Sequence, residues 1–93
     1  MSYEPKFYTW RRRLLRCRDI SLGAKGVGCL IRDALDDIFR EDYITPASLA
    51  EEWGSTERKV LRWLEELEDA GWIVVDGEND KPLYLLTVPE TVV

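Results

Sequence analysis

Two groups of basic side chains are the residues of this sequence best suited to contact another molecule. The first group opens a predicted helix and consists of Arg58, Lys59 and Arg62. Arg62 follows Arg58 by about one helical turn, so the two side chains point the same way. Arginine pairs well with guanine edges and phosphates, and the free amides at a helix start favour anions. The second group lies in the block WRRRLLRCR and comprises Arg11, Arg12, Arg13, Arg16 and Arg18.

Residues for catalysis or metal binding are sparse by comparison. The chain has no histidine, which removes the commonest general base and the commonest metal ligand. Cys17 and Cys29 are too far apart in sequence to resemble the closely spaced pairs of a zinc site. The stretch LGAKGVG has no strand before it and no Lys-Ser/Thr pair after it, so it is not a phosphate loop. We therefore expect no catalytic residue, no metal and no cofactor.

Length and composition predict one small domain. The chain has 93 residues, of which 45% are hydrophobic, and four tryptophans, enough for a compact core. No apolar run approaches the ~20 residues of a membrane span, and residues 1–10 lack the apolar stretch of a secretory signal. We expect a cytoplasmic protein that makes no membrane contact and keeps both cysteines reduced.

Charge is divided unevenly along the chain. The net charge is −5, but residues 1–30 carry +5 and residues 31–93 carry −10. An acidic majority repels nucleic acid as a whole. Any nucleic-acid contact must therefore be local to the basic groups rather than spread over the surface.

The N-terminal half predicts an arm followed by a helix. Residues 1–20 are expected to form a basic aromatic arm that ends in a short turn of helix around Arg11–Arg16. Ser21 is the natural N-cap of a first helix from about Leu22 to Arg40, within residues 21–42. The glycines at positions 26 and 28 are expected to let a neighbouring backbone approach closely. Apolar residues recur there at three- and four-residue steps: Ala24, Val27, Ile31, Ala34, Leu35 and Ile38.

A helix-turn-helix is predicted over residues 45–71, and a β-hairpin over residues 72–88. In the first of the two helices Thr45 caps, Pro46 takes the first position and Gly54 terminates. Thr56 caps the next helix, and Gly71 closes it. The segments WIVV and LYLLTV are rich in strand formers, and DGENDKP between them is turn sequence. The residues expected to be buried are Leu49, Ala50, Trp53, Val60, Trp63, Leu64, Leu67 and Trp72.

These elements predict an α+β, mainly α fold in a single domain of residues 1–93, with a three-helix core and a C-terminal hairpin. Two stretches, LLRCRDISLGAKGVGCLI and LAEEWGSTERKVLRWLEELEDAGWI, carry a further resemblance. The sequence resembles winged helix-turn-helix proteins of phages and mobile elements, of the replication-initiator N-terminal or regulator type. The resemblance covers roughly residues 7–87. Its structural positions are Leu49, Ala50, Gly54, Val60, Leu64, Leu67, Ala70, Gly71 and Ile73.

The resemblance implies that the third helix is a recognition helix for double-stranded DNA, in transcription or replication control. Arg58 and Arg62 would then read bases, Lys59 and Thr56 would hold phosphate, and the arginines of residues 11–18 would grip the flanking backbone. Its outward residues would be Glu57, Arg58, Leu61, Arg62 and Glu65. A structural alternative is that these basic side chains are solvated and paired with Glu65 or Glu66, and that the arm's arginines pair with acidic side chains of the helices.

Several residues depart from that family pattern and favour another class of function. Leu61 is apolar on an outward face, the end of the third helix is acidic, and acids outnumber Lys81 in the hairpin. The rival expectation is a winged-helix interaction module that fits a basic groove on a protein partner, such as a phage-encoded inhibitor of a host nucleic-acid enzyme.

Assembly into a homodimer is also expected, because one short basic helix start holds DNA weakly and two half-sites multiply affinity. Large aromatics beyond the needs of a small core tend to anchor interfaces. The alternative is that the arm folds back over its own first helix. The interface candidates in the arm are Tyr3, Phe7, Tyr8 and Trp10.

Overall fold

The computed structural model describes residues 6–37, 44–78 and 81–89. Within these ranges the chain forms four helices and one antiparallel hairpin, so the expected α+β, mainly helical class is confirmed and its layout is compatible with that of a winged helix. None of the helices in this part of the chain is long and apolar enough to cross a membrane. The elements are α1 (Lys6–Arg16), α2 (Leu22–Leu35), α3 (Pro46–Trp53), α4 (Glu57–Asp69), β1 (Ile73–Glu78) and β2 (Lys81–Leu86).

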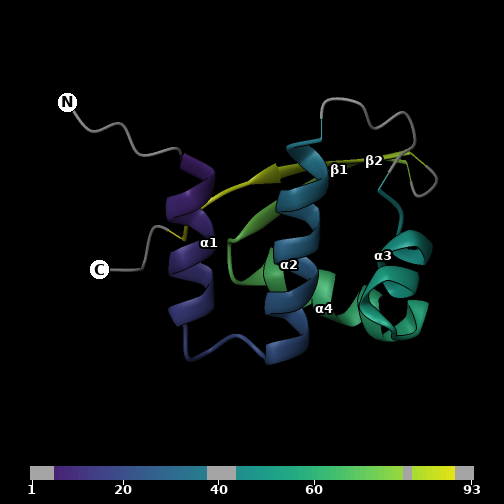
Figure 1. Ribbon diagram of the computed structural model, residues 1–93, viewed down its shortest axis with the longest axis horizontal. Coiled ribbons are helices and arrows are strands. Elements are labelled where there is room, and N and C mark those ends of the chain that lie inside the picture. The colour runs from purple at the N-terminus through teal and green to yellow at the C-terminus, as the bar shows by residue number, and fades with distance from the viewer. Residues whose placement is uncertain (1–5, 38–43, 79–80, 90–93) are drawn as a thin grey trace.

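Helix α2 is the centre of the arrangement (Figure 1). It packs against α1 on one side, against α3 on the other, and against α4. The hairpin follows α4 directly, and in the view of Figure 1 its strands cross the upper part of α2. This order places α1 and α3 on opposite sides of the molecule.

Local capping signals set the helix starts as expected. The side chains of Ser21, Thr45 and Thr56 each accept a hydrogen bond from an amide in the first turn of the helix that follows. Thr45 forms a reciprocal capping box with Ser48, and proline opens α3. Helix α2 ends at Leu35 rather than at Arg40, with Asp36 as its C-cap. The last part of the predicted helix, residues 38–42, lies outside the described residues.

The predicted helical turn around Arg11–Arg16 is confirmed, but the expected arm is wrong over residues 6–10, which belong to the same helix α1. Trp10 and Leu14 are one helical turn apart, and both are buried in the hydrophobic core. The segment therefore folds back onto the helical core, as the structural alternative required. Because Trp10 is only 2% exposed, it is a core residue and the expectation that it anchors an interface is wrong.

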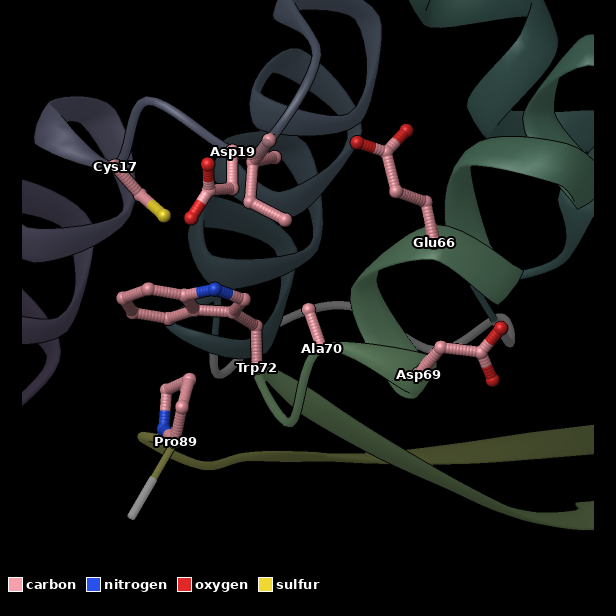
Figure 2. A pocket seen from close by; sticks show the side chains of 8 residues that line it. Cys17, Asp19, Glu66, Asp69, Ala70, Trp72 and Pro89 are labelled. Atoms are coloured by element: carbon pink, nitrogen blue, oxygen red, sulfur yellow. The ribbon is translucent and has the colours of Figure 1, made fainter. Parts of the chain in front are cut away.

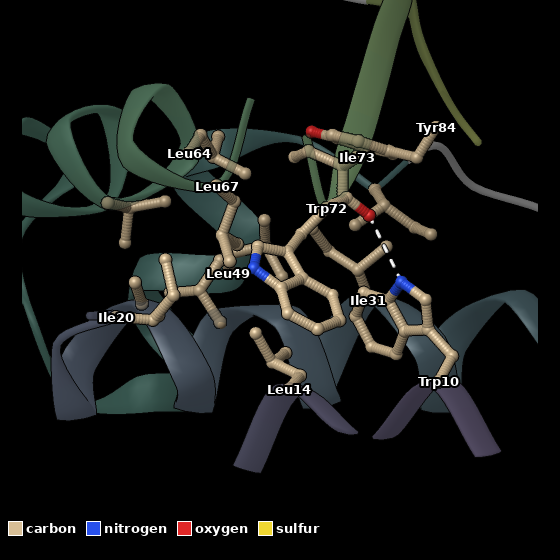
Figure 3. Packing of buried hydrophobic residues seen from close by; sticks show 14 of the residues in the cluster. Trp10, Leu14, Ile20, Ile31, Leu49, Leu64, Leu67, Trp72, Ile73 and Tyr84 are labelled. Carbon is tan, nitrogen blue, oxygen red and sulfur yellow. Dashed lines mark hydrogen bonds between the residues drawn. The ribbon is translucent and has the colours of Figure 1, made fainter. Parts of the chain in front are cut away.

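Trp10 joins α1 to the base of the hairpin (Figure 3). Its indole Nε1 donates hydrogen bonds to the carbonyl oxygens of Trp72, at 3.1 Å, and Thr87, at 2.7 Å. The Trp10 and Trp72 rings meet edge to face, with centroids 6.2 Å apart. Both rings are thus buried with Trp10's polar group satisfied, as buried tryptophans require.

The other tryptophans lie against glycines of α2. A Cβ atom on Gly23 would overlap the ring of Trp63, and one on Gly26 would overlap the ring of Trp53. The glycines thus admit side chains, not the neighbouring backbone that was expected. Trp63 is half-buried against the core, but Trp53 is 40% exposed, so its expected burial is wrong. Trp53 ends α3 and its ring lies against Gly26 of α2, a contact that covers the residue only in part.

The hairpin is longer than its sequence suggested. Asp76 and Gly77 belong to β1, and Lys81 and Pro82 belong to β2, although all four were expected in the turn. The strands pair from Ile73 with Leu86 to Glu78 with Lys81. One face carries Ile73 and Tyr84 into the core, and the other leaves Val74, Leu83 and Leu85 exposed.

If α1 is part of the folded core, removing Trp10 will destabilise the whole protein. We expect Trp10→Ala to lower the free energy of unfolding by about 3–5 kcal/mol, because it leaves a cavity and two carbonyls without their indole donor. Leu15→Ala, on the exposed side of the same helix, should cost less than about 0.5 kcal/mol. Urea denaturation followed by circular dichroism measures both values. Equal stability of the two variants would contradict the placement of α1.

Candidate nucleic-acid interface

The turn between α3 and α4 sets the direction of the basic helix start. Gly54 has φ 67°, a left-handed conformation that glycine adopts without strain. The amide of Ser55 then donates to the Ala50 carbonyl oxygen at 2.9 Å. Thr56 begins α4 by accepting from the Lys59 amide at 3.2 Å. The turn is thereby fixed through backbone and capping contacts, which leave the long side chains of α4 free to face solvent.

Arg58, Lys59 and Arg62 are all exposed on the first two turns of α4. Within the described residues none of them forms an ion pair with an acid. The predicted pairing with Glu65 or Glu66 is therefore not present. These three cations lie near the positive end of the helix dipole, where positive charge favours anions, with the acidic Glu57 in the same first turn.

Glu66 has a different partner, in helix α2. Its two carboxylate oxygens accept hydrogen bonds from the backbone amide and the hydroxyl of Ser21, each at 2.7 Å. The negative charge thus lies at the N-terminus of α2, where it is favourable. Sequence reasoning missed this contact, since residues 45 positions apart show no local pattern.

The arginines of α1, together with Arg18 just after it, belong to a separate surface. Arg11, Arg12, Arg13, Arg16 and Arg18 are all exposed. Arg11 lies 3.8 Å from Asp33 of α2, which also pairs with Arg32 at 3.2 Å, so one expected arm-to-helix pairing is present. Helix α1 and the start of α4 lie on opposite sides of α2 (Figure 1). The two basic groups predicted from the sequence are therefore not brought together.

The hairpin adds acid rather than base near α4. Asp76 and Glu78 are exposed on β1, and Lys81 faces Glu78 across the strands. Asp76 also accepts a hydrogen bond from the Gly77 amide at 2.8 Å. Asp80 lies outside the described residues. A hairpin in which acids outnumber the one described lysine repels phosphate, so it does not add to the positive charge at the start of α4.

A groove of about 420 Å³ runs between α4 and the hairpin. Its apolar lining includes Leu61, which is 51% exposed, and the buried residues Leu64 and Tyr84. Burial raises the pKa of Tyr84 to about 12, so this phenol stays neutral. The carboxylates lining the groove are Glu65, Glu68 and Glu78.

A second hollow, of about 520 Å³, lies where α1 and α4 end (Figure 2). The Trp72 ring forms one wall, Cys17 and Asp19 lie above it, and Asp69 points outward. Among the described residues no group of three or more acids, cysteines or histidines is placed to hold a metal ion. Both cysteines are free, and burial raises the pKa of the Cys29 thiol, which leaves it a poor nucleophile.

The remaining interface candidates lie beyond what the structure describes. Tyr3 precedes the described residues. Phe7 and Tyr8 belong to α1, but their side chains are outside the described part.

The chain matches no protein-family model, no curated protein and no solved structure.

The contact between Glu66 and Ser21 gives a test of how α4 is held. Glu66→Ala removes two hydrogen bonds and a charge at the α2 N-terminus, and should lower the free energy of unfolding by about 1–2 kcal/mol. Glu65→Ala, one residue earlier and exposed, should change it by less than about 0.5 kcal/mol. Thermal or urea unfolding measures the difference. Equal effects would show that Glu66 does not hold α4 to α2.

Proposed function

We propose that this protein is a winged-helix protein that binds double-stranded DNA through the first two turns of α4. The observation that supports the proposal is the exposed group of Arg58, Lys59 and Arg62 directly after the α3–α4 turn, which forms no ion pair with an acid among the described residues. The second helix of such a pair enters the major groove with its early residues against base edges. The sequence resemblance suggests a phage or mobile-element protein that controls transcription or replication.

Each residue of the helix start has a distinct role in this proposal. Arg58 and Arg62 share a face and reach base edges, where paired arginine donors favour guanine. Lys59 points to one side of them and meets a phosphate. The hydroxyl of Thr56 already accepts a bond from its own helix, but its proton remains available for donation to a phosphate oxygen.

The α1 arginines have at most a supporting role in this proposal. They would lie at a distance from the DNA bases that α4 contacts. Helix α4 has 13 residues and is therefore about 20 Å long. Its basic start lies beside α3, whereas its end lies near the Cys17–Ile20 segment that follows α1. Arginines of α1 would meet phosphates well outside the base contacts, and their loss would weaken binding without changing sequence preference.

The acidic groove beside α4 favours a second candidate function, an interaction with a basic protein surface. Glu65, Glu68 and Glu78 line an apolar depression that no described basic residue lines. Apolar surface framed by charge marks protein contacts more often than DNA contacts. This candidate would compete with DNA binding, because Leu61 and Glu65 line the groove and also lie within one helical turn of Arg58 and Arg62.

Substitution of the helix start tests the DNA proposal. On a site selected from random duplexes, Arg62→Ala should weaken binding by about 1–3 kcal/mol and relax the base preference at one position. Lys59→Ala should weaken binding to all duplexes alike. It should also reduce the slope of log affinity against log salt concentration by about one. Fluorescence anisotropy at several salt concentrations measures both effects.

Lys81→Ala is the matched control, because it removes the same charge from the hairpin, away from the start of α4. It should change affinity less than either substitution in α4. If the wild type binds no duplex at low salt, or if Arg58→Ala/Arg62→Ala binds as well as the wild type, the DNA proposal is wrong.

A further inference from the structure

The groove between α4 and the hairpin has the chemistry of a binding site for a basic apolar segment. Its apolar lining comes from Leu61, Leu64, Val75, Pro82 and Tyr84. Within the described residues its rim is purely acidic, with Glu65 and Glu68 one helical spacing apart on α4. An occupant that buries a large apolar side chain there must carry positive charge beside it, because unpaired carboxylates would otherwise lose solvent.

Helix α1 presents such a surface on its outer side. Its inner side is used by Trp10 and Leu14, which are buried. Leu15, next in sequence, is 47% exposed. It is followed by Arg16, which is exposed and forms no ion pair within the described residues. The exposed Arg12 lies three residues before it, about one helical turn away. The outer side of α1 therefore combines one large apolar side chain with arginines, the complement of the groove.

A single molecule cannot make this contact with itself. Helix α1 packs on one side of α2, whereas the groove is lined by Pro46 at the start of α3, on the other side. The hydrogen bonds from Trp10 to the hairpin base hold α1 in place. The outer side of α1 thus remains available only to another molecule.

We infer that the groove binds the outer side of α1 from a second copy of the chain. Leu15 of one copy packs on Leu61 of the other, and Arg16 lies against Glu65 and Glu68. Each contact joins two different surfaces, so association is head to tail. The assembly either closes into a ring or adds further copies as the protein concentration rises. It does not use Arg58 or Arg62, so its failure would leave the proposal of DNA binding untouched.

Charge reversal with rescue tests this contact in the full-length chain. Arg16→Glu and Glu68→Arg both alter exposed side chains, so circular dichroism should show unchanged folding. Sedimentation of the wild type at low salt should give a mean mass above the 10.8 kDa of one chain, falling towards it at ~1 M salt, where the screening length is about 3 Å. Each single variant should sediment as a monomer. The double variant Arg16→Glu/Glu68→Arg should associate again.

Mixing the single variants gives an independent test. The Arg16→Glu chain keeps an acidic groove, and the Glu68→Arg chain keeps a basic α1, so an equimolar mixture should associate although neither variant does alone. Arg18→Glu is the control for total charge, because it makes the same charge change at a residue beyond the end of α1. It should reduce association less than Arg16→Glu. A wild type that stays monomeric at low salt would overturn the inference. So would self-association that neither reversal weakens, or that the double variant and the mixture fail to restore.

Discussion

The burial of Trp10 against Trp72 is the contact on which the arrangement of the molecule depends. One indole group joins the first helix to the carbonyl of Trp72, where the hairpin begins, and to that of Thr87, just after it ends. The same ring lies beside Gly28 of α2, where an added Cβ would be 3.2 Å from the indole. A domain of this size buries a smaller fraction of its surface than a larger one does, so a tryptophan that joins three elements has a large share in its stability.

Fixing α1 in this way determines which charges are left for other molecules. The inner side of α1 covers the core, its described arginines are exposed, and the helix lies on the other side of α2 from the start of α4. Glu66 accepts hydrogen bonds at the start of α2, so it does not neutralise the basic side chains of α4. The result is a basic helix start on a largely acidic surface, next to a groove with an acidic rim. Specificity of a local basic site on such a surface comes from geometry more than from overall attraction.

Features set by neighbours in sequence could be predicted, and those set by distant contacts could not. The caps at Ser21, Thr45 and Thr56, and the ends at Gly54 and Gly71, follow from local hydrogen bonding and backbone conformation. Helix α1 was mistaken for an arm because its aromatic and arginine residues obscured the spacing of Trp10 and Leu14, which is the helical signal. The exposure of Trp53 and the partner of Glu66 depend on how α2 packs, which periodicity along one helix does not contain. Helical periodicity predicted that Arg58, Lys59 and Arg62 are exposed. Only the structure could show that they form no ion pair with an acid in the part of the chain that it describes.

The central claim is that the start of α4 is the surface that meets DNA. The most direct measurement is a nuclear magnetic resonance titration of the ¹⁵N-labelled chain with a short duplex at low salt. The account predicts that the largest amide shift changes fall on Thr56–Arg62, with smaller changes on α1 and little change in the hairpin. Changes confined to α1 or to β1 and β2, or the absence of changes throughout, would contradict it.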